Sequence, residues 1–231
     1  MKTIGLIGGM SWESSIEYYR IINEEVRDRL GKLHSAQSLM YSVDFAGVEE
    51  LQRKGKWEEA TQCMVDAARR LERGGADFVV ICTNTMHKMA DEVQACLDIP
   101  LLHVVDAAAA AVKRRGLTTV GLLGTRFTME EDFYRGRLTR RHGLEVHVPD
   151  AVDQERVHRI IYDELVAGEL LQESKATILR IIDGLVRRGA KGIILGCTEI
   201  PLLIKDGDCS VPVFDTTRIH ALAAVDLALS G

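Results

Sequence analysis

Two stretches decide the fold: ADFVVICTNTMH at 76–87 and AKGIILGCTEIP at 190–201. Each is an apolar run typical of a buried strand, followed at once by small polar residues. In an open parallel sheet, ligands bind at the strand ends where such residues lie. At matching places the first stretch carries Thr83 and the second carries Cys197. The sequence therefore predicts two similar strand ends that differ at one chemically important position.

An internal repeat extends this match along the chain. The paired segments are 4–10 with 120–126, 71–85 with 185–199, and 99–107 with 211–219, at offsets of 116, 114 and 112 residues. Glycines, the strand runs and a leucine before the second strand coincide between the copies. Three segments in the same order at a nearly constant offset indicate two copies of one fold.

Short Val/Ile/Leu runs alternate with longer amphipathic stretches, which is the pattern of βα units in a parallel sheet. We expect strands at 3–8, 38–43, 77–82, 101–104, 119–123, 144–147, 192–196 and 211–214. We expect helices at 13–30, 57–74, 86–95, 106–115, 129–142, 155–167, 172–188 and 217–229. The prediction is an α/β protein of two similar doubly wound domains related by pseudo-two-fold symmetry, with the active site in the interdomain cleft.

The domain boundaries follow from the repeat. We expect a first α/β domain of residues 1–105 plus 210–231 and a second of residues 106–209. Because the chain ends with the partner of the 99–107 segment, the C-terminal helix is predicted to cross back onto the first domain.

Composition excludes several classes of partner. The net charge of −5 comes from interspersed acids and bases without a basic stripe, so neither nucleic acid nor an anionic membrane is an expected partner. No apolar run reaches transmembrane length, and MKTIGLIGGM begins directly with a strand-like run rather than a charged leader. We therefore expect a cytoplasmic protein.

The five cysteines, at 63, 82, 96, 197 and 209, show no C-x-x-C spacing. Neither a disulfide framework nor a metal site is predicted. Cys197 follows an apolar strand and Gly196 and stands at a helix start, where the positive helix end is expected to lower the pKa of a thiol. Cys82 is expected to point away from the site, because successive strand residues face opposite sides.

Small polar residues flank both strand ends. Asn84, Thr85 and Thr198 lie at strand-to-helix junctions, where they either contact a ligand or cap the helix. Glu199 either orients groups near the thiol or complements the helix N-terminus. His87 is interpreted as a residue of the first helical turn, behind the site.

Four motifs, GLIGGMSWES, CTNTMH, LLGTRFTM with DFYRGRL, and LGCTEIPLL, closely resemble the aspartate/glutamate racemase family, the PLP-independent amino-acid racemases. The resemblance covers essentially the whole chain. It implies two α/β domains, a site between them, no cofactor, an amino-acid substrate and a homodimer. It also implies a cysteine on each side of the substrate Cα, one removing the α-proton and the other delivering one to the opposite face.

The sequence departs from this family pattern at residue 83. Aligning Asn84 and Thr85 on the family's Cys-Asn-Thr puts Thr83 where the first cysteine belongs, and the internal repeat gives the same alignment. A threonine hydroxyl is too weak an acid to serve as a standing base near neutral pH. We therefore expect Cys197 and Thr83 to be the catalytic pair, with a preference for the L-enantiomer.

The substrate contacts expected from the resemblance and the strand ends are Met10, Gln52, Asn84, Thr85, Thr198 and Glu199. Arg53 is a candidate for binding a side-chain carboxylate, unless Gln52 and Arg53 lie on a solvated loop. The choice between aspartate, glutamate and a broader substrate range depends on pocket geometry.

Two other functions remain open at this point. Arylmalonate decarboxylases resemble the same superfamily and use only the second-domain cysteine to protonate a carbanion. Alternatively, a non-catalytic protein that binds small acids could have kept the cleft after losing one cysteine. Loss of carbon dioxide from malonates, or binding of aspartate without exchange at Cα, would distinguish them.

Overall fold

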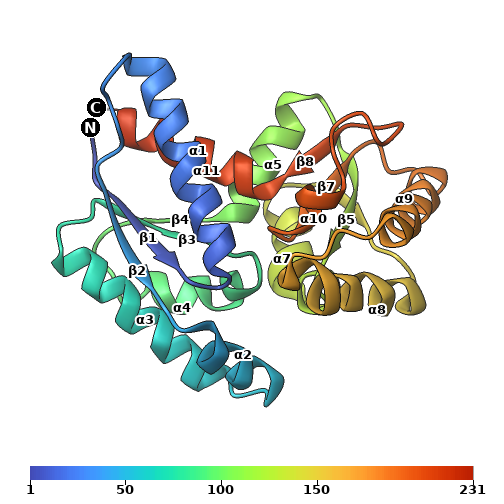
Figure 1. The fold of residues 1–231 in the computed structure, drawn as a ribbon, viewed down its shortest axis with the longest axis horizontal. Helices are drawn as coiled ribbons and strands as arrows, with labels where there is room; N and C mark the ends of the chain where they lie inside the picture. The colour runs from blue at the N-terminus through green and yellow to red at the C-terminus, as the bar shows by residue number, and fades with distance from the viewer. Residues whose placement is uncertain (231) are drawn as a thin grey trace. The chain divides into compact units, whose positions relative to one another are not determined.

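A computed structural model describes residues 1–230. The chain is an α/β protein with two four-stranded parallel sheets, drawn in Figure 1. It divides into two compact units: Met1–His103 together with the residues from His220 onward, and Val104–Ile219. Each unit has its own sheet and its own apolar layers.

The sheet of the first unit has the strand order β2-β1-β3-β4. Its strands are β1 (Ile4–Gly8), β2 (Ser38–Ser42), β3 (Phe78–Ile81) and β4 (Leu101–Leu102). Its helical segments are α1 (Trp12–Leu30), α2 (Phe45–Arg53), α3 (Trp57–Arg73), the 3₁₀ turn η1 (Thr85–Met89), α4 (Ala90–Gln94) and most of α11 (Thr216–Leu229).

The second sheet repeats this topology as β6-β5-β7-β8. Its strands are β5 (Thr119–Gly124), β6 (Glu145–His147), β7 (Ile193–Gly196) and β8 (Val213–Asp215). Its helical segments are α5 (Val104–Arg114), α6 (Arg126–Glu130), α7 (Asp132–Gly136), η2 (Arg137–Arg141), α8 (Ala151–Arg159), η3 (Ile160–Glu164), η4 (Leu165–Ala167), α9 (Gln172–Arg187) and α10 (Ile200–Leu203).

All eight expected strands are present, whereas some helices differ from the expectation. Helix α2 was not predicted, because its nine residues are too few for a clear 3.6-residue pattern. The helix expected at 129–142 is divided at Glu131, whose backbone is extended (φ −83°, ψ 153°). The helix expected at 155–167 begins earlier, at Ala151, where Asp150 caps it by accepting from Asp153 N.

The boundaries of the units also differ from those expected. Strand β8 pairs with β7, with Val213 opposite Ile193, so residues 210–219 lie with the second unit rather than the first. The first unit ends at His103 instead of residue 105. Strand pairing decides the first point, and it joins residues about twenty positions apart, beyond the reach of local sequence patterns.

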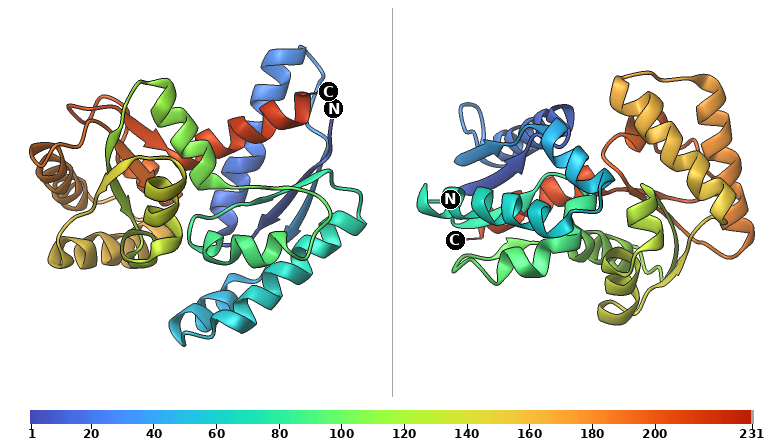
Figure 2. Two further views of the ribbon diagram at one scale, coloured as in Figure 1. Left: turned by 180° about the vertical axis from the view of Figure 1, so that it is seen from behind. Right: turned by 90° about the horizontal axis from the view of Figure 1, so that it is seen from below.

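Alternate residues of β3 pack in different apolar layers of the first unit. Phe78, Val80 and Cys82 pack with α1 and α11, whereas Val79 and Ile81 pack with α3. Figures 1 and 2 show α1 and α3 on opposite sides of the β1–β3 region. Cys82 belongs to the α1 and α11 layer and is fully buried, so its thiol lies on the other side of the sheet from Val79 and Ile81.

The same alternation operates in the second unit. Ile193, Leu195 and Cys197 belong to the layer formed with α8 and α9, whereas Ile194 packs with α5. Cys197 thus continues the alternation of Ile193 and Leu195. At the repeat offset of 114 residues, Thr83 follows Val79 and Ile81 in the same alternation.

A glycine in the central strand of each sheet allows a crossover helix to pack closely. Gly5 lies opposite Val79 and Gly121 opposite Ile193, which is the same register in both units. A Cβ at Gly5 would lie 3.3 Å from Leu71 Cβ, and one at Gly121 would lie 3.3 Å from Leu185 Cβ. The two leucines are equivalent in the repeat, so the glycine–leucine contact explains why these residues recur together.

We expect Gly5→Ala to destabilise the protein by about 1 to 3 kcal/mol, because the added methyl would also lie 2.9 Å from Ala76 Cβ in a packed layer. Gly47→Ala is the matched control, since a Cβ at this helical position of α2 meets nothing within 4 Å. Alanine there should leave stability unchanged or raise it by up to about 1 kcal/mol. Urea unfolding would measure both variants, and equal effects would contradict the close-approach argument.

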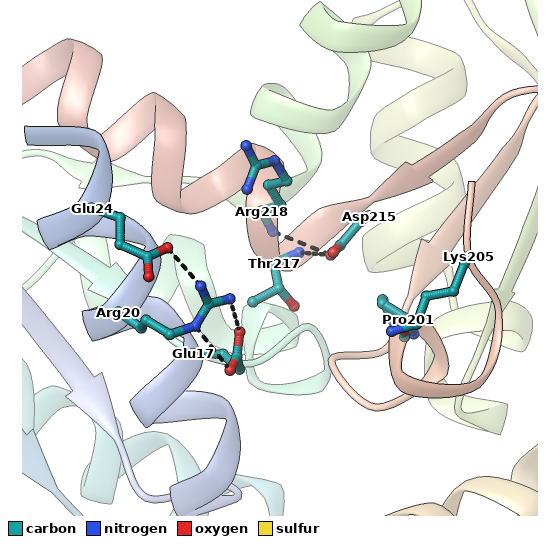
Figure 3. Close-up of polar contacts among 8 residues, drawn as sticks. All are labelled: Glu17, Arg20, Glu24, Pro201, Lys205, Asp215, Thr217 and Arg218. Atoms are coloured by element: carbon teal, nitrogen blue, oxygen red, sulfur yellow. Dashed lines mark hydrogen bonds and ion pairs between the residues drawn. The ribbon is translucent and has the colours of Figure 1, made fainter. Parts of the chain in front are cut away.

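Helix α11 is fixed at its start by two sets of hydrogen bonds. In the second unit, Asp215 Oδ1 accepts from the backbone N–H groups of Thr217 and Arg218 at 2.9 and 3.2 Å, as Figure 3 shows. In the first unit, the His220 ring lies 2.9 Å from both Tyr18 Oη and the Leu102 carbonyl. Because a carbonyl only accepts, His220 Nε2 carries the hydrogen, and Nδ1 accepts from the Tyr18 hydroxyl.

Burial lowers the pKa of His220 to about 4, against an ordinary value of 6.5. Since the folded-state pKa lies below the unfolded one, the stabilising contribution is complete above pH 6.5 and is lost as the pH falls toward 4. The total loss is about 3 kcal/mol. Gln at this position keeps one donor and one acceptor but does not titrate.

We therefore expect His220→Gln to lose less stability than the wild type between pH 6.5 and pH 4. The measurement is the free energy of unfolding in urea at several pH values for both proteins. Parallel curves would show that His220 does not titrate between the folded and unfolded states.

Candidate functional site

The carboxyl end of β3 carries a group of buried polar residues. Thr83, Asn84 and Thr85 are only 9, 3 and 7% exposed, and the chain turns directly into η1 after them. Asn84 stands at the start of η1 but makes no side-chain capping bond to it. The interpretation of Asn84 as a helix cap is therefore wrong.

Gln52 reaches the same turn from α2. It is 6% exposed, and its Nε2 donates to Met86 Sδ at 3.0 Å. The alternative that Gln52 lies on a solvated loop is wrong. Arg53, in contrast, has a 66% exposed side chain beside Glu49.

Met10 lies in the same apolar layer as Met86, and its side chain is 4% exposed. The loop that carries it is held by Ser15, whose Oγ accepts from Gly9 N at 2.8 Å and donates to Ser11 O at 3.1 Å. The first unit thus brings the loop after β1 and the turn after β3 into one packed region, with Gln52 against that turn.

Thr83 itself has a partner that the sequence did not assign. The Thr83 carbonyl lies 2.7 Å from His87 Nδ1, four residues further along the turn. His87 is 2% exposed. Thr83 and His87 are four residues apart, a spacing that brings two residues together in a helical turn, and this was the sign of their contact in the sequence. Sequence alone, however, does not distinguish a buried histidine from a solvated one.

The carboxyl end of β7 carries a thiol paired with a carboxylate. Cys197 Sγ donates to Glu199 Oε2 at 2.9 Å, and Thr198 Oγ1 donates to the same oxygen at 2.7 Å. Cys197 and Glu199 are 6 and 8% exposed. Of the two interpretations of Glu199, the geometry supports the one in which it orients groups near the thiol.

The electrostatics of Cys197 differ from the sequence expectation. Burial raises the pKa of the thiol well above its ordinary value, and the negative charge of Glu199 and the hydrogen bond to it act in the same direction. The backbone N–H groups of Glu199 and Ile200 lower the pKa, but to a smaller extent. The expectation of a lowered pKa is wrong, because α10 has only four residues and burial dominates.

The Cys82 thiol is kept protonated for the same reason. Its thiol is fully buried in an apolar layer, and burial alone raises its pKa far above the ordinary range. No ionised partner contributes to this shift. Of the two cysteines at strand ends, Cys197 is the one with an acceptor for its proton.

The structure brings the predicted site residues together in two groups. Met10, Gln52, Thr83, Asn84 and Thr85 gather in the first unit, and Cys197, Thr198 and Glu199 gather in the second. Within residues 1–230, no set of three or more His, Cys, Asp and Glu side chains could hold a metal ion. In the same range, no helix has the length and apolar character needed to cross a membrane.

Comparison with known proteins gives one consistent family. Residues 7–224 match the model of the Asp/Glu/hydantoin racemase family. The broad specificity amino-acid racemase RacX of Bacillus subtilis is 24% identical over 98% of each chain.

Two solved structures are also similar along the whole chain. A protein from Yersinia pestis, whose assignment as an Asp/Glu racemase is provisional, is 55% identical with a TM-score of 0.94 and full coverage of both chains. An aspartate racemase homologue from Pyrococcus horikoshii is 40% identical with a TM-score of 0.86 and 99% coverage of both.

The pairing of Cys197 with Glu199 can be tested by thiol labelling. We expect a small alkylating reagent to label Cys197 slowly near neutral pH, with a rate that still rises above pH 9, because the raised pKa keeps the thiol protonated. Glu199→Gln removes the charge but keeps an acceptor, so it should speed labelling by about tenfold at a given pH.

Labelling is followed by mass spectrometry of the Cys197 peptide, with exposed Cys63 as the internal standard. Glu173→Gln, an exposed carboxylate on α9, is the control and should leave the rate unchanged. A Cys197 rate that is insensitive to Glu199→Gln would show that the carboxylate does not control the thiol.

Proposed function

Because the chain belongs to the Asp/Glu/hydantoin racemase family, we propose that it is a cofactor-independent racemase of acidic amino acids that uses Cys197 and Thr83 on opposite faces of the substrate Cα. The observation that carries this proposal is the buried Cys197–Glu199 pair at the end of β7. Thr83 occupies the equivalent position at the end of β3. The proposal requires the two strand ends to face one substrate.

The first step removes the α-proton of the L-enantiomer. Glu199 accepts the proton of the Cys197 thiol, and the resulting thiolate takes the proton from Cα. A carbanion next to the substrate carboxylate must then be stabilised, which backbone N–H groups at strand ends can do. In this role Glu199 is a proton acceptor for the thiol rather than the substrate contact that the sequence suggested.

The second step returns a proton on the Thr83 face. A carbanion is a much stronger base than a threonine alkoxide, so the Thr83 hydroxyl can donate its proton to Cα and recover one from water. The reverse direction needs Thr83 to act as a base, which its weak acidity prevents near neutral pH. Deprotonation should therefore be far faster for the L-substrate than for the D-substrate, so the α-proton of the L-form should exchange with solvent far more readily.

Substrate recognition falls to the remaining polar residues. We assign substrate contacts to Asn84, Thr85, Gln52 and Thr198, and to the backbone at Met10, whose side chain is occupied by packing. Among the relatives, RacX is described as having broad specificity. The substrate range should therefore be measured with neutral amino acids as well as with aspartate and glutamate.

We expect the wild type to exchange the α-proton of L-aspartate or L-glutamate for deuterium in deuterated water, and the D-enantiomers about 100-fold more slowly or less. Cys197→Ser should abolish exchange from the L-form. Thr83→Cys restores a second thiol, so it should raise exchange from the D-form by about 100-fold. Proton NMR of the Cα signal measures all of these rates.

The pH dependence provides a second check on the same step. Because the pKa of Cys197 is raised, the thiolate becomes more populated as pH increases, and exchange from the L-form should rise with pH beyond neutrality. Equal exchange from both enantiomers in the wild type would contradict the asymmetric mechanism. Binding of aspartate that is unchanged by Cys197→Ser and occurs without exchange would favour a binding protein.

One observation also favours a second candidate. A thiol that keeps its proton at rest is suited to protonating a carbanion, which is the step that a single-cysteine decarboxylase of malonates requires. Release of carbon dioxide from an arylmalonate, lost in Cys197→Ser, would support that activity. A homodimeric state and a cytoplasmic location remain predictions from the sequence.

A further inference from the structure

Three buried histidines lie together in the first unit, near the end of β3. His87, His103 and His220 are 2, 6 and 0% exposed. The His87 ring centre lies 4.7 Å from that of His103 and 5.5 Å from that of His220. The chemistry described above uses none of them, although they come from three separate segments of the chain.

The contact with Thr83 shows which nitrogen of the His87 ring carries a hydrogen. Its Nδ1 lies 2.7 Å from the Thr83 carbonyl oxygen. Because a carbonyl oxygen only accepts, Nδ1 must carry a hydrogen and donate it. The bond is within the turn, and the His87 backbone N–H also donates to Asn84 O at 3.1 Å. His87 therefore holds the backbone of Thr83 and Asn84 at two successive carbonyls.

The ring of His220 supports the ring of His87. Both His220 nitrogens are already engaged, with the Tyr18 hydroxyl and the Leu102 carbonyl, each at 2.9 Å. This fixes the plane of the His220 ring, which packs against His87 at an interplanar angle of 64°. His103 packs against the same ring at 54°. A ring confined in this way has little freedom to release the Thr83 carbonyl.

We propose that His87 is a positioning residue for the Thr83 side of the site, with His103 and His220 holding its ring. The bond from Nδ1 holds the peptide plane after Thr83 and so limits movement of the backbone that carries the Thr83 hydroxyl. This inference rests on the proposed racemase function and deepens it. It assigns His87 to the delivery of the second proton and not to the removal of the first.

The two proton transfers can be separated experimentally. In deuterated water, Cys197 alone can take the α-proton of an L-substrate and return a deuteron to the same face, giving deuterated L-substrate. Deuterated D-product also requires delivery from the Thr83 face. The ratio of D-product to total exchange thus reports on the Thr83 side, independently of how much enzyme is active.

Three substitutions at one position test the bond. Asn places an amide nitrogen the same number of bonds from the backbone as His Nδ1, whereas Gln places it one bond further, and Leu has no donor. We expect His87→Leu and His87→Gln to lower the ratio of D-product to total exchange by about tenfold or more, since small misplacements of reacting groups are costly. His87→Asn should recover the ratio to within about threefold of the wild type.

His147→Gln in the second unit controls for the loss of a histidine, and it should leave the ratio unchanged. A purely structural role for His87 would lower both products together, so an unchanged ratio in His87→Leu and His87→Gln overturns the proposal. Failure of His87→Asn to recover the ratio overturns it as well. An absence of exchange by the wild type with every amino acid tried overturns the proposed function itself, and this inference with it.

Nitrogen NMR of the histidine rings in the wild-type protein tests the geometry without any substitution. The proposal requires a slowly exchanging hydrogen on His87 Nδ1. Detection of His87 with its hydrogen on Nε2 alone overturns the proposal even if the Leu and Gln variants fail to fold.

Discussion

The close approach of a crossover helix to the central strand of each sheet underlies the rest of the structure. Gly5 and Gly121 leave room for Leu71 and Leu185, and they pair with Val79 and Ile193, which are equivalent residues of the strands that lead to the site. This contact fixes the register between the first strand and the strand that bears Thr83 or Cys197. Since side chains alternate along a strand, a slip of one residue would turn either group to the other face.

The second constraint is the burial of charge at the end of β7. A thiol beside a carboxylate is kept protonated by burial and by the negative charge, and the short helix that follows is too small to reverse this effect. A reaction at Cys197 therefore begins by moving the thiol proton. Glu199 is the group that lies within hydrogen-bonding distance of that proton.

The end of β3 is organised by different means. No thiol is available there except Cys82, which the strand alternation directs into the apolar layer with α1 and α11. The polar residues are instead held by hydrogen bonds to their backbone, among them the one from the His87 ring to the Thr83 carbonyl. Two strand ends with one topology thus carry different chemical groups, a thiol paired with a carboxylate at one end and a hydroxyl at the other.

The sequence by itself determined the repeat, the parallel strands and the positions where they end, because these depend on local periodicity and on apolar runs. It also determined that Thr83 and Cys197 are equivalent and that Cys82 is not a substitute. Only the tertiary structure decided that β8 pairs with β7, that Gln52 is buried, that burial and Glu199 raise the pKa of Cys197, and that His87 holds the Thr83 carbonyl. These features depend on burial and on contacts between distant segments, and neither can be read from the spacing of residues along the chain.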